Sequence, residues 1–281
     1  MSVKPARAFY EATMDNYMQS LVNHNPSLLP LAKKIKRTEN TIPLRPGDGL
    51  WATASDLPTY KLYVVDPQGG QVGFYGFMKE NGFPILIASR LKIVKEEITE
   101  IEDIVVREGG MPFVPANLVK PRSIFLEPLK PEEKMSRAEM IRVSDLYFDA
   151  LVQDDGNIAP FYDECNRHEN SMLTTNNESL FPPKPGEKPR PRDCRGQISS
   201  GSFAYITSIE PRRWTVIDEE RGITFGSFMF HHTGTIDHKD VPGYGRVEML
   251  PIARRPFSVI VSELFKVMNG KIREIEAVMT S

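Results

Sequence analysis

The feature that most constrains the fold is an internal repeat, because a repeated block of this length must fold into the same unit twice. An ungapped alignment joins residues 17–40, YMQSLVNHNPSLLPLAKKIKRTEN, to residues 147–170, YFDALVQDDGNIAPFYDECNRHEN, at an offset of 130 residues. Both copies keep a tyrosine, a Leu-Val pair, a proline and a final Arg-x-Glu-Asn. The chain therefore contains two copies of one module, over about 10–107 and about 137–280.

Two more blocks repeat in the same order. VVDPQGGQVGFYGFM (64–78) resembles VIDEERGITFGSFMF (216–230), and SRLKIVKEEITEIEDIVV (89–106) resembles SELFKVMNGKIREIEAVMT (262–280). The offset grows to about 152 by the second block, which places an insertion in the second copy at LFPPKPGEKPRPRDC (180–194), where five prolines rule out a continuous helix or central strand. We expect a first domain over 1–107, a proline-rich linker lying on the surface over 108–135, and a second domain over 136–281.

Composition excludes several functional classes. The 281 residues carry 35 basic and 37 acidic side chains without a long run of like charge, so nucleic acid and anionic membranes are poor partners. The N-terminus lacks the apolar core of a signal peptide, and no stretch approaches the roughly 20 apolar residues of a membrane span. We expect a cytoplasmic protein whose two cysteines, Cys165 and Cys194, are reduced thiols.

The order of elements in each copy predicts the fold class. Apolar residues at three-to-four spacing predict an opening helix around Met14, Tyr17 and Leu21 in the first copy and around Met140 and Tyr147 in the second. A second helix is predicted over 28–38 and 158–168, and only strands follow, joined by PQGG and ENG turns. Two helices followed by a curved antiparallel meander indicate an α+β protein built as two tandem cone-shaped barrels, each with helices packed in its sheet.

This pattern resembles the nuclear transport factor 2-like superfamily, which includes SnoaL-like polyketide cyclases, ketosteroid isomerase and scytalone dehydratase. The resemblance rests on the closing RLKI…I.EIE strand pair and on EN…GDGLW after the first repeated block. It extends, through PF.D.CNR.EN…TTN and DEERG in the second half, to a group of fungal and bacterial tandem proteins. It implies a cavity at the open end of each barrel and acid/base chemistry there, without a cofactor.

Candidate catalytic residues gather in CNRHENSMLTTNN (165–177). His168 can move protons near neutral pH, and Glu169 beside it would fix its tautomer. The first copy has Thr38 at the position of His168, but it keeps Arg37, Glu39 and Asn40. The equivalent residues Arg167, Glu169 and Asn170 therefore have an alternative, structural role, in which they hold the end of the predicted helix to the sheet by hydrogen bonds. The residues predicted to bind substrate are Arg167, Asn170, Thr174, Thr175, Asn176, Tyr147, Phe228 and His232.

Other candidates lie outside this cluster. Tyr162 replaces Ala32 of the first copy, and His231 and His232 end the strand ITFGSFMFHH, where alternation sends them to opposite faces. We place Tyr162 and His231 with His168 and Glu169 as catalytic candidates, and the sequence leaves open which face of the 223–232 strand is inside. Trp51, Phe74, Tyr75, Trp214 and Phe230 could line an apolar pocket or form core.

The sequence lacks GxGxxG, P-loop, GxSxG and HExxH motifs, so we expect neither a cofactor nor a metal site. The leading hypothesis is a cofactor-independent lyase or isomerase that dehydrates, isomerises or cleaves a small, partly aromatic, hydroxylated substrate, with homo-oligomerisation left open. The alternatives are a non-catalytic module that binds a hydrophobic ligand, or a structural tandem in which the first copy supports the second.

Overall fold

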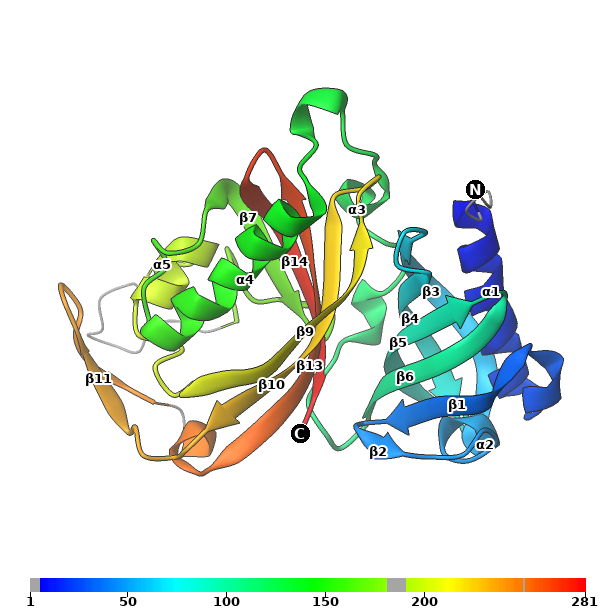
Figure 1. Ribbon diagram of the computed structural model, residues 1–281. Coiled ribbons are helices and arrows are strands. Elements are labelled where there is room, and N and C mark those ends of the chain that lie inside the picture. Colours follow the sequence, from blue (N-terminus) through cyan, green and yellow to red (C-terminus); the bar gives the residue numbers. More distant parts are fainter. Residues whose placement is uncertain (1–5, 181–190, 250) are drawn as a thin grey trace.

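The computed structural model describes residues 6–180, 191–249 and 251–281 and contains two six-stranded sheets (Figure 1). Their strand orders, β2-β1-β6-β5-β4-β3 and β8-β7-β14-β13-β10-β9, are the same order repeated. This confirms the duplication and the α+β class. The part of the insertion over 181–190 lies outside the described residues.

The first module consists of α1 (Arg7–Val22), β1 (Leu31–Glu39), β2 (Ile42–Pro43), α2 (Leu50–Thr53), β3 (Ala54–Asp66), β4 (Gln71–Glu80), β5 (Phe83–Val94) and β6 (Glu97–Arg107). The second consists of α4 (Arg137–Gln153), β7 (Phe161–Glu169), β8 (Met172–Leu173), α5 (Cys194–Ser199), β9 (Ser208–Asp218), β10 (Ile223–His232), β11 (His238–Val241), β12 (Gly245–Glu248), β13 (Phe257–Met268) and β14 (Lys271–Thr280). The segment between them includes the short helix α3 (Ser123–Leu126).

The predicted second helices are wrong: 28–38 and 158–168 contain the strands β1 and β7. Each pairs in parallel with the last strand of its own module, β1 with β6 and β7 with β14. The sheets are therefore mixed rather than purely antiparallel. These short segments have too few apolar residues to decide between helix and strand, and a partner strand that follows about 65 residues later in the first module and about 110 residues later in the second decides instead.

The predicted opening helices are confirmed. In α1 the residues Met14, Tyr17, Met18 and Leu21 are buried, and in α4 the corresponding buried face includes Met140, Val143, Tyr147 and Leu151. Ser136 caps α4 by accepting a hydrogen bond from the backbone N–H of Glu139. Each helix thus fills the concave face of its curved sheet, and side chains from the sheet and the helix meet inside the cone.

The two modules pack through the convex outer faces of their sheets. A shared core includes Tyr75 and Val64 of the first module and Phe225 and Leu264 of the second. Gly73 allows this approach, because a Cβ there would lie 3.1 Å from the Phe225 ring. The proline-rich segment does not simply lie on the surface, because Leu118 and Phe125 are buried in the same core.

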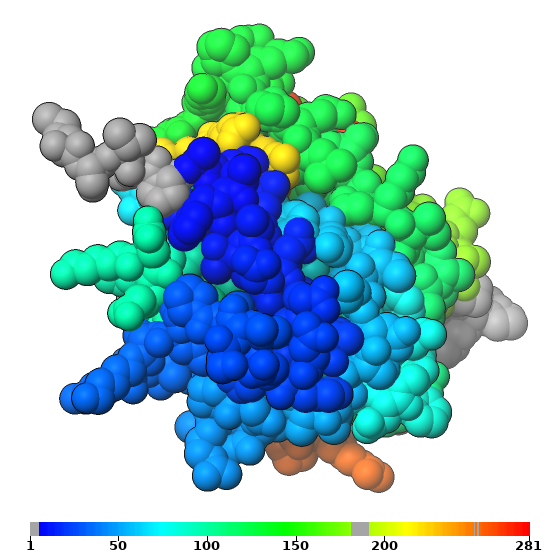
Figure 2. Space-filling model, turned by 90° about the vertical axis from the view of Figure 1, so that its right-hand side faces the viewer, coloured from blue at the N-terminus to red at the C-terminus, as the bar shows by residue number. Residues whose placement is uncertain are grey.

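The ion pairs that cross this interface include two in a pseudo-twofold arrangement. Arg7 of α1 donates to the buried carboxylate of Asp218 at 2.6 Å, and Arg137 of α4 donates to the buried carboxylate of Asp66. Arg7 and Arg137 are equivalent in the repeat, as are Asp66 and Asp218. Figure 2 shows α1, in dark blue, reaching the yellow β9–β10 segment of the other module. The chain is therefore built like a symmetric dimer in one polypeptide.

In the first module the short helix α2 takes the place of α5 in the chain order, but the open end of the second cone carries a larger cover. It consists of α5, residues 200–207 and the β11–β12 hairpin, and it has a small apolar cluster of its own that includes Ala204, Val241 and Met249 (Figure 1). Among the described residues, no helix is long and apolar enough to cross a membrane.

Candidate functional site

The structure divides the CNRHEN residues between two faces of β7. Arg167 and Glu169 point into the cone, whereas His168 points outward, because neighbouring side chains of a strand alternate. The predicted pairing of His168 with Glu169 is therefore wrong. It depended on expecting a helix where the chain forms a strand.

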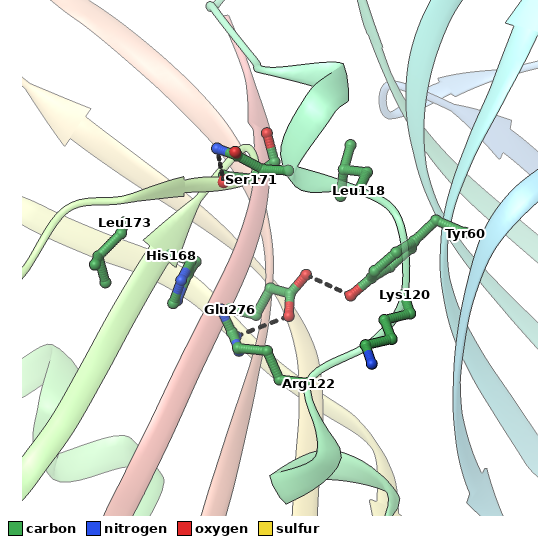
Figure 3. Close-up of a pocket in the computed structure, with 9 residues that line it drawn as sticks. Tyr60, Leu118, Lys120, Arg122, His168, Ser171, Leu173 and Glu276 are labelled. Atoms are coloured by element: carbon green, nitrogen blue, oxygen red, sulfur yellow. Dashed lines mark hydrogen bonds and ion pairs between the residues drawn. The ribbon is translucent and has the colours of Figure 1, made fainter.

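His168 lies in a groove of about 300 Å³ between the two modules (Figure 3). The groove is lined by Tyr60, Asn117, Leu118, Lys120, Arg122, His168, Ser171, Leu173 and Glu276. Glu276 accepts a hydrogen bond from the Tyr60 hydroxyl at 3.0 Å and one from Arg122 at 2.8 Å. The carboxylate of Glu276 is thus already partnered by the connecting segment and by the first module.

The imidazole of His168 is poorly solvated. Its side chain is 19% exposed, and Nδ1 has no hydrogen-bond partner among the described residues and lies 3.6 Å from Glu274 Oε1. Burial, with a smaller contribution from the Arg122 cation, lowers the pKa of His168 to about 3, and burial raises the pKa of Glu274 to about 7. His168 is therefore neutral throughout the physiological pH range.

A titration tests this environment. The ring C–H signals of His168 in NMR spectra are expected to stay constant from pH 8 to about 5, where an ordinary histidine changes. Because the unfolded chain takes up a proton below about 6.5, His168 should also make the fold less stable as the pH falls from there toward 3.

The charge of Arg122 provides the matched comparison. Arg122→Gln should raise the pKa of His168, whereas Lys120→Gln, in the same groove, should leave it unchanged. Normal titration of His168 in the unmodified protein would contradict the description of a buried imidazole.

The remaining predicted histidines and Tyr162 do not meet in a site. His231 faces outward, with Nδ1 2.9 Å from Ser258 Oγ and Nε2 2.9 Å from the Glu210 carbonyl oxygen. His232 faces inward and stacks between the rings of Tyr205 and Phe257. Tyr162 lies on the outer face, and its hydroxyl accepts a hydrogen bond from Asn269 in the β13–β14 turn. The inward face of β10 is thus the one that carries Phe228, Phe230 and His232.

Aromatic side chains fill the apolar part of the second cone. Phe148 of α4 packs against Phe228 with ring centroids 4.3 Å apart, and Trp214 and Phe265 lie within 6 Å of the same ring. Tyr147 adds edge contacts to Phe161 and Phe265. Phe228 and Trp214 pack against each other, and Phe230 packs against Phe148, so these residues, which were considered as pocket walls, belong to the core.

The polar part of the cone is organised around the fully buried guanidinium of Arg167. Its Nε lies 2.8 Å from Glu169 Oε1 and donates to Thr174 Oγ1 at 3.2 Å, and its Nη1 lies 3.5 Å from the Tyr147 hydroxyl. Nη2 donates to Gln197 Oε1 of α5. The structure thus brings together four predicted residues with Gln197, which was not predicted.

Three other predicted binding residues hold the backbone. Asn170 bonds both the N–H and the carbonyl oxygen of Met279, as Asn40 does with Val105 in the first module. Thr175 Oγ1 accepts a hydrogen bond from the Arg167 N–H, and Asn176 Nδ2 donates one to the Cys165 carbonyl oxygen.

A row of three inward side chains differs between the two cones. In the first cone, strand register places Glu39, Asp103 and Ser89 side by side on β1, β6 and β5. The same register in the second cone places Glu169, Ala277 and Glu263 side by side on β7, β14 and β13. The central carboxylate has become a methyl group, and a carboxyl group now stands on each side of it.

In the first cone the central carboxylate is fully partnered. Asp103 accepts hydrogen bonds from the Tyr17 hydroxyl at 2.6 Å and from Ser89 Oγ at 2.7 Å, and Arg37 lies 3.8 Å away. Burial nevertheless raises the pKa of Asp103 to about 6. Both carboxylate oxygens of Asp103 are thus engaged within the first module.

Glu263 in the second cone is different. It is buried, and its Oε2 has no hydrogen-bond partner among the described residues. Burial raises its pKa well above the usual range of a glutamate, which the nearby Arg167 only partly offsets. Glu169, the other carboxylate of the row, is 27% exposed and connects the cluster to solvent.

The sequence comparison missed Glu263 because the third repeated block was aligned from Ser89 and Ser262. The β-turns give the correct register, since β5 ends at Val94 and β13 at Met268. Counting from these turns, backward along β5 and β13, pairs Ser89 with Glu263. Counting forward along β6 and β14 pairs Asp103 with Ala277. The replacement of Ser89 and Asp103 by Glu263 and Ala277 was therefore visible in the sequence. Within the described residues, no group of three or more His, Cys, Asp or Glu side chains could hold a metal ion.

The geometry describes a tandem α+β protein with a buried polar cluster in each cone, and in the second cluster Glu263 Oε2 has no hydrogen-bond partner among the described residues. A protein-family model described as Domain of unknown function (DUF8021) matches residues 133–279, and the chain belongs to this family. A comparison with curated proteins finds no match.

Solved structures with similar folds each cover about half of the chain or less. One is an NTF2-like protein of unknown function from Cytophaga hutchinsonii, at 12% identity, 38% of this chain, 95% of that chain and a TM-score of 0.29. Another is a provisionally assigned polyketide cyclase from Silicibacter sp. TM1040. It is 11% identical, the match covers 52% of this chain and 91% of that chain, and the TM-score is 0.33. A third is a provisionally assigned ketosteroid isomerase from Kribbella flavida. It is 11% identical, the match covers 41% of this chain and 90% of that chain, and the TM-score is 0.31.

Proposed function

We propose that the second cone is the active site of a lyase or isomerase that acts by proton transfer on a small, partly aromatic molecule carrying a hydroxyl or carbonyl group. The observation that carries this proposal is the row Glu169–Ala277–Glu263. Two carboxyl groups flank a small side chain on adjacent strands, beside Tyr147 and Arg167. Strands lie about 4.8 Å apart, so the two carboxyl-bearing backbones are roughly 10 Å apart with Ala277 between them.

The two carboxyl groups suit opposite roles. Burial raises the pKa of Glu263 well above the usual range of a glutamate, so Glu263 is the better suited of the two to carry a proton and to give it to a departing hydroxyl or a developing oxyanion. Glu169, which is paired with Arg167 and open to solvent, is the carboxylate that would take a proton from carbon. In a dehydration, the C–H proton goes to Glu169, the carbon–oxygen bond breaks, and the proton of Glu263 leaves in the water formed.

The surrounding groups would orient the substrate. The Tyr147 hydroxyl and the Arg167 guanidinium are donors beside Glu263, so they would stabilise negative charge on an oxygen. The aromatic cluster of the cone packs directly beside these donors through Tyr147. Gln197 of α5 lies directly on Arg167, so a substrate would approach these donors beside Glu169 or after displacement of the cover.

One probe compound separates the possible reactions. 4-Hydroxy-4-phenylbutan-2-one gives an enone on dehydration and benzaldehyde on retro-aldol cleavage, and in D2O it gains deuterium next to the carbonyl if only proton abstraction occurs. We expect at least one of these changes with the unmodified protein and none with Glu169→Gln. No change with this probe and with a panel of related aryl hydroxyketones would argue for the alternative, a module that binds a ligand without turning it over.

The groove that contains His168 is the rival location, since it has a volume of about 300 Å³ and an unpartnered imidazole nitrogen. His168→Ala should leave the activity unchanged if the cone is the site. Loss of activity in that variant, with normal activity in Glu169→Gln, would move the site to the groove.

A further inference from the structure

The only two cysteines of the chain meet at the edge of the proposed active site. Cys165 lies on β7 and faces into the cone, and Cys194 is the first residue of α5. Both are buried, and their Sγ atoms are 2.7 Å apart. Cys194 Sγ also lies 3.2 Å from the Cys165 carbonyl oxygen.

This approach is closer than ordinary packing of two thiols. A sulfur–sulfur bond measures about 2.05 Å, so a small movement of either side chain brings the two atoms to bonding distance. Cys165 corresponds to Ile35 in the first copy, and the first copy contains no cysteine. The sulfur pair is therefore specific to the covered cone.

We propose that Cys165 and Cys194 form an intramolecular disulfide that cross-links α5 to β7. With oxidised glutathione as the oxidant, the two thiols lose two protons and two electrons, one sulfur–sulfur bond forms between the cysteines, and the glutathione disulfide is reduced to two glutathione thiols. One cysteine first forms a mixed disulfide with glutathione, and the other then displaces the second glutathione.

The position of the cross-link gives it a consequence for the site, and this consequence rests on the proposed function. Gln197, three residues after Cys194, bonds to Arg167 and to the Thr174 carbonyl oxygen. Arg167 is two residues after Cys165 on the same face of β7. The disulfide would therefore hold α5 over the polar cluster, and reduction would free it to move.

Mass spectrometry of the full chain tests the cross-link. After incubation with oxidised glutathione and alkylation under denaturing conditions, we expect a protein lighter than the reduced form by two hydrogen atoms, with no alkylated cysteine and with one peptide pair joined through Cys165 and Cys194. Cys194→Ser provides the control and should take up one alkyl group. Two alkylated cysteines, or glutathione adducts alone, in the unmodified protein would overturn the proposal.

Thermal unfolding and turnover separate the cross-link from its effect on the site. The bond closes a loop of about 30 residues, so the oxidised protein should melt about 5–10 °C above the reduced one. If the probe compound is turned over more slowly only in the oxidised form, α5 controls access. Equal rates in the two forms would show that α5 does not control access, while the mass spectrum would still establish the disulfide. Absence of turnover in both forms would count against the proposed function alone.

Discussion

Glu263→Gln is expected to lower the rate of the proton-transfer reaction by about 10²- to 10⁴-fold, the usual contribution of a general acid or base. The amide keeps the shape of the side chain and can donate a hydrogen bond, but it cannot deliver a proton. A dehydration or cleavage that needs a protonated leaving group should therefore be affected most, and an isomerisation that needs only stabilisation of an oxyanion should be affected least.

The same variant should leave the fold intact or make it more stable. The pKa of Glu263 is raised in the folded protein, so the folded state holds a proton that the unfolded chain releases above about pH 4.3. Stability from this group is thus lost as the pH rises through the folded pKa. Glutamine does not titrate, so the free energy of unfolding of the variant does not decrease in this way as the pH rises. In urea unfolding, the stability of the variant relative to the unmodified protein should therefore increase from pH 5 to pH 8.

Glu274→Gln is the matched control for this experiment. Glu274 is also a buried glutamate of the second module with a pKa raised by burial, to about 7, but it faces outward from the cone toward His168. It should retain the reaction rate while showing a similar dependence of stability on pH. A normal rate in Glu263→Gln together with a reduced rate in Glu274→Gln would assign the chemistry to the groove.

The repeat allowed much of the fold to be predicted from the sequence. The helices α1 and α4 and the four strands of each meander follow from local periodicity and turn residues, which both copies supply independently. The first strand of each module was missed because its pairing with β6 or β14 joins distant parts of the chain. Local sequence contains little information about such a parallel partner.

The site was harder to predict for the same reason. Comparing the copies indicated His168, a residue that changes within a kept frame, but the direction of its side chain depends on β7 being a strand. Glu263 and Ala277 also change between the copies, and their meaning depends on cross-strand register, which places them beside Glu169. A one-residue error in register moves every side chain to the other face.

Replacing Arg137 with methionine is expected to have the largest effect on stability. The change leaves the carboxylate of Asp66 buried, with hydrogen bonds only from the backbone N–H groups of Gly69 and Ile217. Removing one partner of a buried ion pair costs about 3–5 kcal/mol in the free energy of unfolding. Because both groups lie at the interface, the loss should appear in a urea unfolding curve that reports on both modules.

The pseudo-twofold symmetry supplies the control for that measurement. Arg7→Met should cost a similar amount, because Asp218 is equally buried and keeps the backbone N–H groups of Val65 and Arg221 as donors. Arg45→Met, which removes an exposed ion pair with Asp48, should change stability little. If Arg7→Met and Arg137→Met were both as mild as Arg45→Met, the reciprocal pairs would not hold the modules together. The shared apolar core, with Phe125 of the connecting segment inside it, would then account for their association.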